Sequence, residues 1–146
     1  MLGSLLTDRK FRVARNWSNS EIERFAPLFS GRVVNVSAWK DEDKQGRRYR
    51  EYFNAADSNH LTNFRADARG VQGLEGEVFL DLSAPLPDEF EQSFDCVFNH
   101  TTLEHIYEVH TAFSNLCRMS RDAVMVVVPF LQEMHAGYGD FWRFTP

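Results

Sequence analysis

The amino-acid sequence predicts an α/β protein whose sheet is mostly parallel and doubly wound. Two segments late in the chain, 93–99 and 123–130, are apolar along most of their length, and a helical pattern lies between them. Strands that are apolar on both faces are typical of parallel sheets covered by helices on each side. Right-handed strand–helix–strand connections then produce a doubly wound sheet. Such sheets bind ligands at the carboxyl ends of their strands, where Asn99 and His100 stand.

Size and composition indicate one globular domain. The chain has 146 residues, of which 43% are hydrophobic, and this is enough to form a core. We divide it into an N-terminal arm with a capping helix, 1–30, and the body of the domain, 31–146. The formal net charge is −5 and no long basic run occurs, so we expect no nucleic-acid partner. No apolar run is long enough to span a bilayer, so we expect no membrane partner.

The two cysteines indicate the compartment. Cys96 and Cys117 lie among apolar residues without a CxxC spacing, so we interpret both as buried free thiols. Free thiols fit a reducing environment. The N-terminus lacks the basic start and long apolar core of a signal peptide. We therefore expect a cytoplasmic protein.

The first helix and the first strand follow from local patterns. Ser18 to Glu21 has the form of a capping box, and apolar residues then recur at helical spacing. Ser30 and Gly31 are expected to end this helix. The apolar segment 32–38 is the first predicted strand.

The middle of the chain alternates loops with short elements. We expect an exposed charged loop over 39–48, a short helix over 49–56, a second strand over 60–64 and a glycine-rich loop over 65–76. A third strand is predicted over 77–82. Three aromatic side chains of the short helix are expected to point inward: Tyr49, Tyr52 and Phe53.

The last third contributes a strand, a helix, a strand and a tail. An acidic turn over 88–92 leads into the strand over 93–99. The next helix is expected to bury one face, made of Val109, Ala112, Phe113 and Leu116. The final strand, 123–130, is apolar, and an unpaired edge of this kind promotes aggregation. We therefore expect further chain, a partner such as a second copy, or the tail to cover that edge.

Six stretches of the chain resemble the class I S-adenosylmethionine-dependent methyltransferases. The resemblance is strongest to a small group with an aspartate, an aromatic pair and Arg-Phe-Thr-Pro after the fifth strand. The stretches are 31–38, 79–87, 93–99, 103–106, 127–130 and 140–146. The resemblance implies a Rossmann-like sheet in the order 3-2-1-4-5, with helices on both faces. Family members usually continue with two further strands and a helix. A sequence ending at Pro146 is then either truncated or naturally short.

The resemblance also implies that S-adenosylmethionine lies across the ends of strands one to four. Its amino-acid end is expected over the turn after the first strand, its ribose by the second strand and its adenine by the third and fourth. Asp81 would accept from the adenine amino group and Leu82 would pack on the ring. The cofactor-binding residues expected on this basis are Asn35, Val36, Ser37, Ala38, Asn63, Asp81, Leu82, Asn99 and His100.

Simpler roles are open for some of these residues, and two positions depart from the family pattern. Asp81 is also suited to cap the turn that follows it, and His100 to bond the backbone of a loop. Ser37-Ala38-Trp39 stands where the family has Gly-x-Gly. Asn63 stands where the family has an acid for the ribose hydroxyls, and a neutral amide accepts more weakly than a carboxylate.

The tail carries the residues that we expect to act on the substrate. His135 has the chemistry of a general base and Asp140 could orient it. Trp142 and Arg143 are expected to bind the substrate, with Arg143 holding an anionic group. Alternatively, the aromatic tail packs against the sheet and Arg143 pairs with Asp140.

Glu104 and His105 recur across the family whatever the substrate. We interpret this pair as positioning residues at the start of a helix, where a carboxylate is favoured by the helix dipole.

The leading functional hypothesis is a methyltransferase acting on a small molecule or a glycan. The second is a methyltransferase-like binding or assembly domain without cofactor affinity, which forms a homodimer through the edge of the last strand. A third, a metal-dependent hydrolase, would use His100, His105, His110 and His135. His105 and His110 are five positions apart and point about 140° away from each other on a helix, and no HExxH motif occurs, so we expect no metal.

Overall fold

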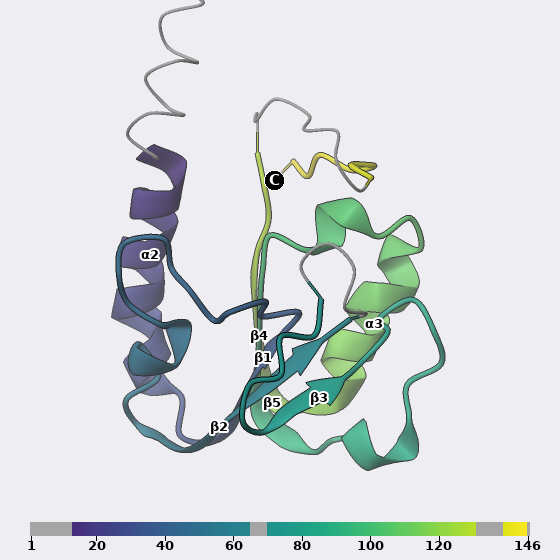
Figure 1. Cartoon of the computed structure of the whole chain (residues 1–146), viewed down its shortest axis with the longest axis horizontal. Helices are drawn as coiled ribbons and strands as arrows, with labels where there is room; N and C mark the ends of the chain where they lie inside the picture. Colours follow the sequence, from purple (N-terminus) through teal and green to yellow (C-terminus); the bar gives the residue numbers. More distant parts are fainter. Residues whose placement is uncertain (1–12, 65–69, 131–138, 146) are drawn as a thin grey trace, which may run out of the picture.

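The computed structural model of the protein describes residues 13–64, 70–130 and 139–145 (Figure 1). A five-stranded sheet lies at its centre, with the strand order β3-β2-β1-β4-β5. Every neighbouring pair of strands is parallel. The strands are β1 (Gly31–Val36), β2 (Ala56–Asn63), β3 (Glu77–Phe79), β4 (Phe94–His100) and β5 (Ser120–Val127). The predicted α/β fold class and strand order are confirmed.

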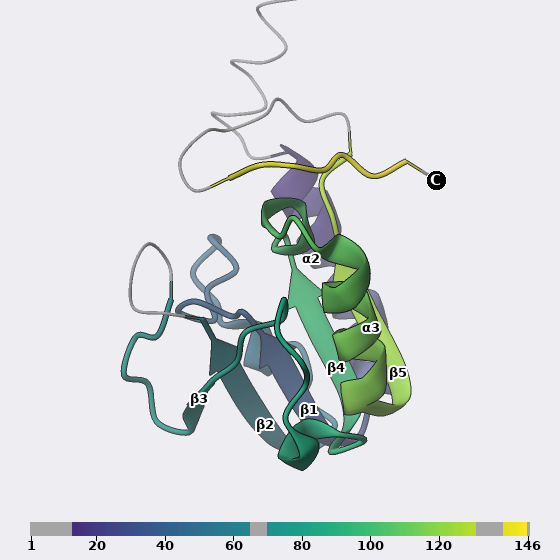
Figure 2. The ribbon, with the colours of Figure 1, turned by 90° about the vertical axis from the view of Figure 1, so that its right-hand side faces the viewer.

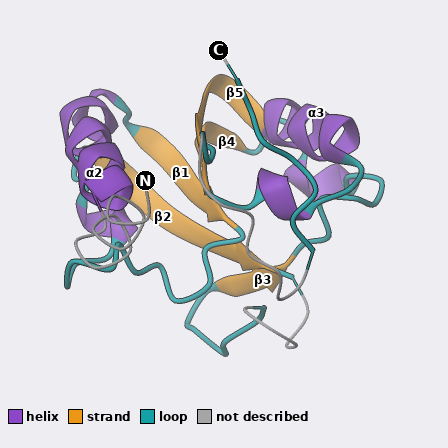
Figure 3. Ribbon diagram, turned by 90° about the horizontal axis from the view of Figure 1, so that it is seen from above, coloured by secondary structure: helices purple, strands orange, loops and turns teal. Residues whose placement is uncertain are grey.

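Two α-helices cover opposite faces of the sheet (Figure 3). They are α2 (Val13–Phe25) and α3 (Val109–Met119), and Figure 2 views α3 in front of β4 and β5. Short 3-10 helices complete the described chain: η1 (Ala26–Leu28), η2 (Tyr49–Glu51), η3 (Asp88–Phe90) and η4 (Leu103–His105). No helix in these ranges is long and apolar enough to cross a membrane.

The core has two parts because successive strand residues point to opposite faces. Val33 packs in the cluster that contains Ile22 of α2, whereas Val34 packs in the cluster that contains Leu116 of α3. Both valines are buried. Central strands buried on both faces explain why their sequences are apolar without alternation.

Some element boundaries differ from the predicted ones. α2 already includes Val13, so Ser18 lies inside the helix instead of capping it. The Ser18 hydroxyl donates to the Arg15 carbonyl one turn earlier, at 3.0 Å. A Ser-x-x-Glu pattern therefore does not mark a helix start when the preceding residues are also helical. β2 begins at Ala56, four residues earlier than predicted, and the β3 ladder ends at Phe79.

The charged segment 39–48 is a loop, but it is not wholly exposed. The side chains of Asp41 and Asp43 are fully buried. Asp43 accepts from the Tyr52 hydroxyl at 2.6 Å and from the backbone N–H groups of Gln45 and Arg47 at 2.6 and 3.0 Å. Burial acts to raise the pKa of Asp43, but these hydrogen bonds lower it. The loop therefore folds around its own carboxylates.

Two predictions about α3 are wrong. Phe113 is 47% exposed, and Met119 is buried in the helix face instead. Cys117 is exposed, whereas Cys96 on β4 is buried. Burial raises the pKa of the Cys96 thiol to about 12. The buried residues of α3 are therefore Val109, Ala112, Asn115, Leu116 and Met119.

Candidate ligand-binding site

A cleft of about 500 Å³ lies over the carboxyl ends of the parallel strands. Its wall contains residues from the ends of β1, β2 and β4 and from the segment after β3, which is where a sheet of this topology binds ligands. Seven of the nine expected cofactor-binding residues line it: Asn35, Ser37, Ala38, Asn63, Asp81, Leu82 and His100.

The other two expected residues do not line the cleft. Val36 and Asn99 are fully buried and lie opposite each other in the β1–β4 register. The Asn99 amide donates to the Val36 carbonyl at 2.8 Å. This bond between buried residues holds the ends of two strands together below the cleft floor.

The turn after β1 has the backbone shape of a glycine turn without glycine. Ser37 and Trp39 have φ angles of 58° and 50°, in the left-handed region that non-glycine residues rarely adopt. The Ala38 N–H donates to the Thr62 carbonyl at 3.1 Å and fixes the turn to β2. Trp39 lines the cleft and carries the Lys44 ammonium 3.5 Å from its ring centroid. An indole and a cation therefore form this wall, which the sequence did not predict.

Asn63 shapes this turn. Its amide oxygen accepts from the Trp39 N–H at 2.6 Å and its amide nitrogen donates to the Trp39 carbonyl at 2.9 Å. The same nitrogen donates to Glu77. Asn63 is 1% exposed. The expected ribose acceptor is therefore already bonded, because an amide, unlike a carboxylate, can pair with both the N–H and the C=O of one residue.

Glu77 is a structural residue that sequence reasoning missed. Its carboxylate accepts from the N–H groups of Gln72 and Leu74 at 2.9 and 3.0 Å, in addition to Asn63. Burial acts to raise its pKa, but these hydrogen bonds lower it. Its position directly after the glycines of the preceding loop was the available signal, because such a loop has backbone donors without partners.

Asp81 caps the turn that follows it, which is one of the two roles that the sequence left open, and it also lines the cleft. One carboxylate oxygen accepts from the Ser83 N–H at 2.9 Å and from the Ser83 hydroxyl at 2.6 Å, which caps the turn. Within the described parts of the chain, the second oxygen has no hydrogen-bond partner, and Asp81 lines the cleft. Leu82 lines the cleft next to it and also packs in the core cluster that contains Leu116. The pair thus offers an acceptor beside an apolar surface.

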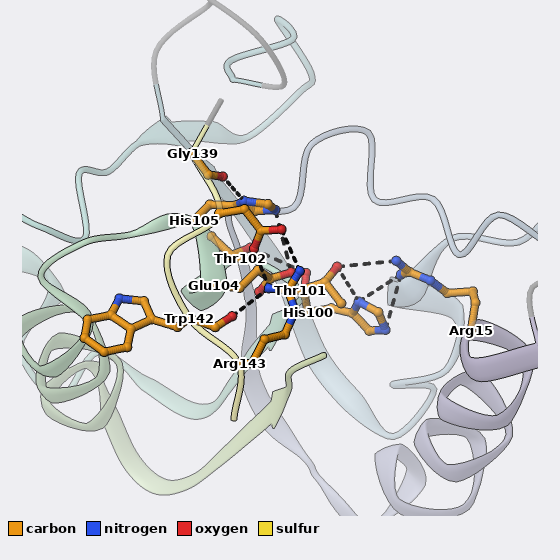
Figure 4. A network of polar contacts seen from close by, with 10 residues as sticks. Arg15, His100, Thr101, Thr102, Glu104, His105, Gly139, Trp142 and Arg143 are labelled. Carbon is orange, nitrogen blue, oxygen red and sulfur yellow. Dashed lines mark hydrogen bonds and ion pairs between the residues drawn. The ribbon is translucent and has the colours of Figure 1, made fainter. Parts of the chain in front are cut away.

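His100 ends β4 and is bonded to side chains, not to a loop backbone as the alternative expected (Figure 4). Its Nδ1 lies 2.8 Å from an Arg15 guanidinium nitrogen, and its ring stacks on Tyr49 with 5.1 Å between centroids. Burial lowers the pKa of His100 well below its usual value, and Arg15 lowers it further. Arginine can only donate, so His100 is a neutral ring that accepts at Nδ1.

The tail from Gly139 onward follows the packing alternative. Arg143 forms a two-pronged ion pair with Asp140, one arm of which measures 2.6 Å. The Trp142 indole donates to the Ile106 carbonyl at 2.9 Å and its ring packs against the core. Asp140, Trp142 and Arg143 do not line the cleft, whereas Phe141 does. His135, the expected base, lies outside the described residues.

Glu104 and His105 anchor the tail. The Glu104 carbonyl accepts from the Phe141 and Trp142 N–H groups at 2.8 and 3.3 Å, and His105 Nδ1 lies 2.5 Å from the Gly139 carbonyl (Figure 4). Both residues are in η4, before α3, so the dipole of α3 does not explain Glu104. The Glu104 side chain is buried, and this burial raises its pKa to about 7. His105 lines the cleft.

The described residues contain no cluster of three or more potential metal ligands. Of the four histidines considered for a metal, His100 and His105 line the cleft. The His100 ring is bonded to Arg15, a cation, which is an unsuitable neighbour for a metal ion.

The sheet order and the cleft define the class of this protein as a Rossmann-like α/β domain. No protein-family model matches the chain, and no curated protein sequence matches it significantly. Among solved structures it is similar to a proposed Zn-dependent alcohol dehydrogenase from Rhodobacter sphaeroides, with a TM-score of 0.55 and 18% sequence identity. The match covers 75% of this chain and 48% of that one, so this chain spans about half of its length. At this identity the similarity concerns the fold alone.

Proposed function

We propose that this chain is an S-adenosylmethionine-dependent methyltransferase domain that acts on a small molecule or a glycan. The observation that carries the proposal is the composition of the cleft wall. The glycine-like turn after β1 and the Asp81–Leu82 pair after β3 line one cleft. The family resemblance assigns the amino-acid end of the cofactor to the first of these and its adenine to the second.

The residues of the wall suit these roles. Ser37 and Ala38 are small, so the turn admits close approach of a ligand to the backbone. The second oxygen of Asp81 can accept from an exocyclic amine, and Leu82 offers an apolar surface for a flat ring. Bound S-adenosylmethionine would supply an electrophilic methyl group. The cleft would align an acceptor atom with it, and this alignment is a large part of catalysis in group transfer.

A second candidate function is a non-catalytic binding or assembly domain without cofactor affinity. The tail residues expected to act on the substrate, Asp140 and Arg143, are paired with each other, and Trp142 packs in the core. The amide of Asn63 is bonded within the protein. In this version the domain would assemble with a second copy through β5, whose residues 123–127 remain partly exposed at the sheet edge.

Calorimetric titration with S-adenosylhomocysteine, the demethylated product, tests the proposal. We expect micromolar binding by the native chain. Asp81→Asn keeps an oxygen for the Ser83 turn but replaces the second acceptor by a donor, so we expect at least roughly tenfold weaker binding. Asp88→Asn, on η3 and outside the cleft, is the matched control and should bind like the native chain.

The outcomes separate the candidate functions. Binding that Asp81→Asn weakens supports cofactor recognition and rejects the module without cofactor affinity. Methyl transfer to a panel of small molecules and glycans then tests the activity itself. No heat with folded protein at millimolar ligand would reject cofactor binding. A parallel titration with NADH is needed because dinucleotide-binding sheets share this strand order. We expect no NADH binding, since the sequence has no Gly-x-Gly-x-x-Gly motif.

A further inference from the structure

Arg15 extends from α2 to the wall of the cleft, where it meets residues that are distant from it in the sequence (Figure 4). Its guanidinium donates to the Tyr49 hydroxyl at 2.8 Å, to His100 Nδ1 at 2.8 Å and to the Thr101 hydroxyl at 3.3 Å. These bonds fix the direction of the side chain. Arg15 therefore forms part of the cleft and not of the outer surface of α2.

All three acceptors of Arg15 are uncharged. Within residues 13–64, 70–130 and 139–145, no carboxylate lies within ion-pair distance of its guanidinium. Six other arginines of these ranges do have an acidic partner: Arg24, Arg47, Arg50, Arg118, Arg121 and Arg143. Arg32 and Arg48 have no ion pair within these ranges, but both are exposed, whereas Arg15 is partly buried. A partly buried cation with only neutral partners is costly unless a counter-ion completes the site.

Three acids of this region, Glu104, Glu42 and Asp81, do not supply that counter-ion. Glu104 is close enough for Arg15 to lower its pKa, but burial has the larger effect and raises that pKa to about 7. Glu42, also in the cleft wall, pairs with Lys44 at 3.2 Å. Asp81 is bonded to Ser83 at the end of the segment after β3. Burial raises the pKa of Tyr49 as well, so its phenol stays neutral at physiological pH.

The backbone at Thr101 supports a built site. Thr101 is β-branched and has a φ of 49°, which is a strained conformation for such a residue. Its N–H donates to the Val127 carbonyl at 2.8 Å, so the β5 end holds it there. This conformation directs its hydroxyl at Arg15 and His100. Strain of this kind persists where the surrounding structure enforces it, and it concentrates at ligand sites.

We propose that Arg15, with the Tyr49 and Thr101 hydroxyls, forms a carboxylate-binding subsite of the cleft. Guanidinium matches a carboxylate because both are planar and pair through parallel hydrogen bonds. This subsite takes the anion-binding role that the sequence assigned to Arg143, which Asp140 already neutralises. This assignment rests on the proposed function. The carboxylate then belongs either to the amino-acid end of the methyl donor or to an anionic methyl acceptor.

The first arm of the test compares S-adenosylmethionine with its decarboxylated analogue, which differs only in that group. If the subsite binds the methyl donor, the native chain prefers the carboxylated form by roughly tenfold or more. Arg15→Gln loses most of this preference, and Arg15→Lys retains part of it because the charge remains. Arg24→Gln, an exposed position on the same helix, is the matched control and keeps the full preference.

The second arm follows the Arg15 Nε–H resonance by NMR during titration with sodium acetate at constant ionic strength. Arg15→Gln assigns this resonance by its loss from the spectrum. A saturable shift of the resonance in the native chain supports the subsite even if the chain binds no S-adenosylmethionine. If the shift disappears when S-adenosylhomocysteine is bound, the site belongs to the donor's carboxylate. If it persists, the site belongs to the acceptor. An absent acetate shift together with a carboxylate preference that Arg15→Gln leaves unchanged would overturn the proposal and leave Arg15 as a structural tie.

Discussion

At the scale of single residues, the carboxyl group of Glu104 is an unusual feature. It is 1% exposed, and its Oε2 atom has no hydrogen-bond partner among the described residues. His105 Nε2 lies 3.7 Å from its other oxygen. Asp140 raises the pKa of this group, while Arg143 and Arg15 lower it, but burial has the largest effect and brings it to about 7. The Glu104 carboxyl is therefore protonated below about pH 7, next to the tail that the Glu104 backbone carbonyl anchors.

Glu104→Gln should remove a pH dependence of stability. The ordinary pKa of Glu104 is 4.5 and the folded value is about 7. Between these values the folded state holds the proton that the unfolded state releases, so stability falls as pH rises from about 4.5 to about 7. A shift of this size corresponds to about 3 kcal/mol. Urea unfolding across this pH range should therefore show the variant gaining about 3 kcal/mol relative to the native chain.

The comparison depends on the change with pH and not on absolute stability, because Gln also alters local hydrogen bonds. Glu89→Gln on η3 is an exposed control and should give a difference from the native chain that does not vary over the same range. A native-minus-variant difference that stays constant from pH 4 to 8 for Glu104→Gln would show that the carboxyl is ionised in the fold.

At the scale of elements, the turn between β1 and the loop that follows decides the shape of the cleft floor. Ser37 and Trp39 have positive φ angles. The amide of Asn63, on β2, bonds both the N–H and the carbonyl of Trp39. The turn thus keeps its conformation by cross-strand bonds instead of by glycine. Such a conformation should tolerate glycine and reject β-branched side chains.

Ser37→Val is expected to lower stability by roughly 1–3 kcal/mol, because a β-branched residue is strained at a φ of 58°. Ser37→Gly removes the strain and should change stability by less than about 1 kcal/mol, since glycine has its own entropic cost. Ser58→Val, on the extended strand β2, is the matched control and should be well tolerated. Thermal unfolding measures all three. Equal losses for Val at positions 37 and 58 would show that the turn is not strained.

The elements that were predicted best are those whose own residues show a clear pattern, without information from the rest of the chain. β1 and β4 could be predicted because a strand buried on both faces is apolar along its length, as Val33 and Val34 of β1 show. β5 has the same apolar pattern, although its residues 123–127 are only partly buried. The start of α2 could not be predicted in this way, because the Ser18–Glu21 pattern is local and the helix continues through it. The exposure of Phe113 could not be predicted either, because an apolar residue in a helix does not by itself show what it packs against.

The site was predictable to the same extent and for the same reason. Parallel topology places the ends of β1, β2 and β4 and the segment after β3 at one edge. The strand pattern pointed to His100 on this basis, and the family resemblance added Ser37, Asn63 and Asp81. What each side chain bonds was not predictable. The Arg15–His100 contact spans 85 positions in the sequence, and such pairings follow from tertiary packing alone.

At the scale of the whole molecule, the sheet converts separate loops into one binding surface. β1 and β4 lie at its centre and contribute the most deeply buried residues, whereas β3 is a three-residue edge strand with exposed Val78 and Phe79. Stability should therefore decrease from the centre toward β3. The cleft lies across this gradient, with its β4 side rigid and its β3 side easier to open.

Hydrogen exchange with and without S-adenosylhomocysteine should show this organisation. If the ligand occupies the whole cleft, it should slow exchange together at residues 37–39, 81–83 and 100–102, which follow three different strands and line the cleft wall. Slowing should be greatest at 81–83, since these amides open most easily in the free protein. The end of α2 and η1, residues 22–28, lie outside the cleft wall and should be unchanged. Slowing at only one of the three segments would mean that the ligand binds beside the cleft, because a molecule lying across the sheet must cover all of them at once.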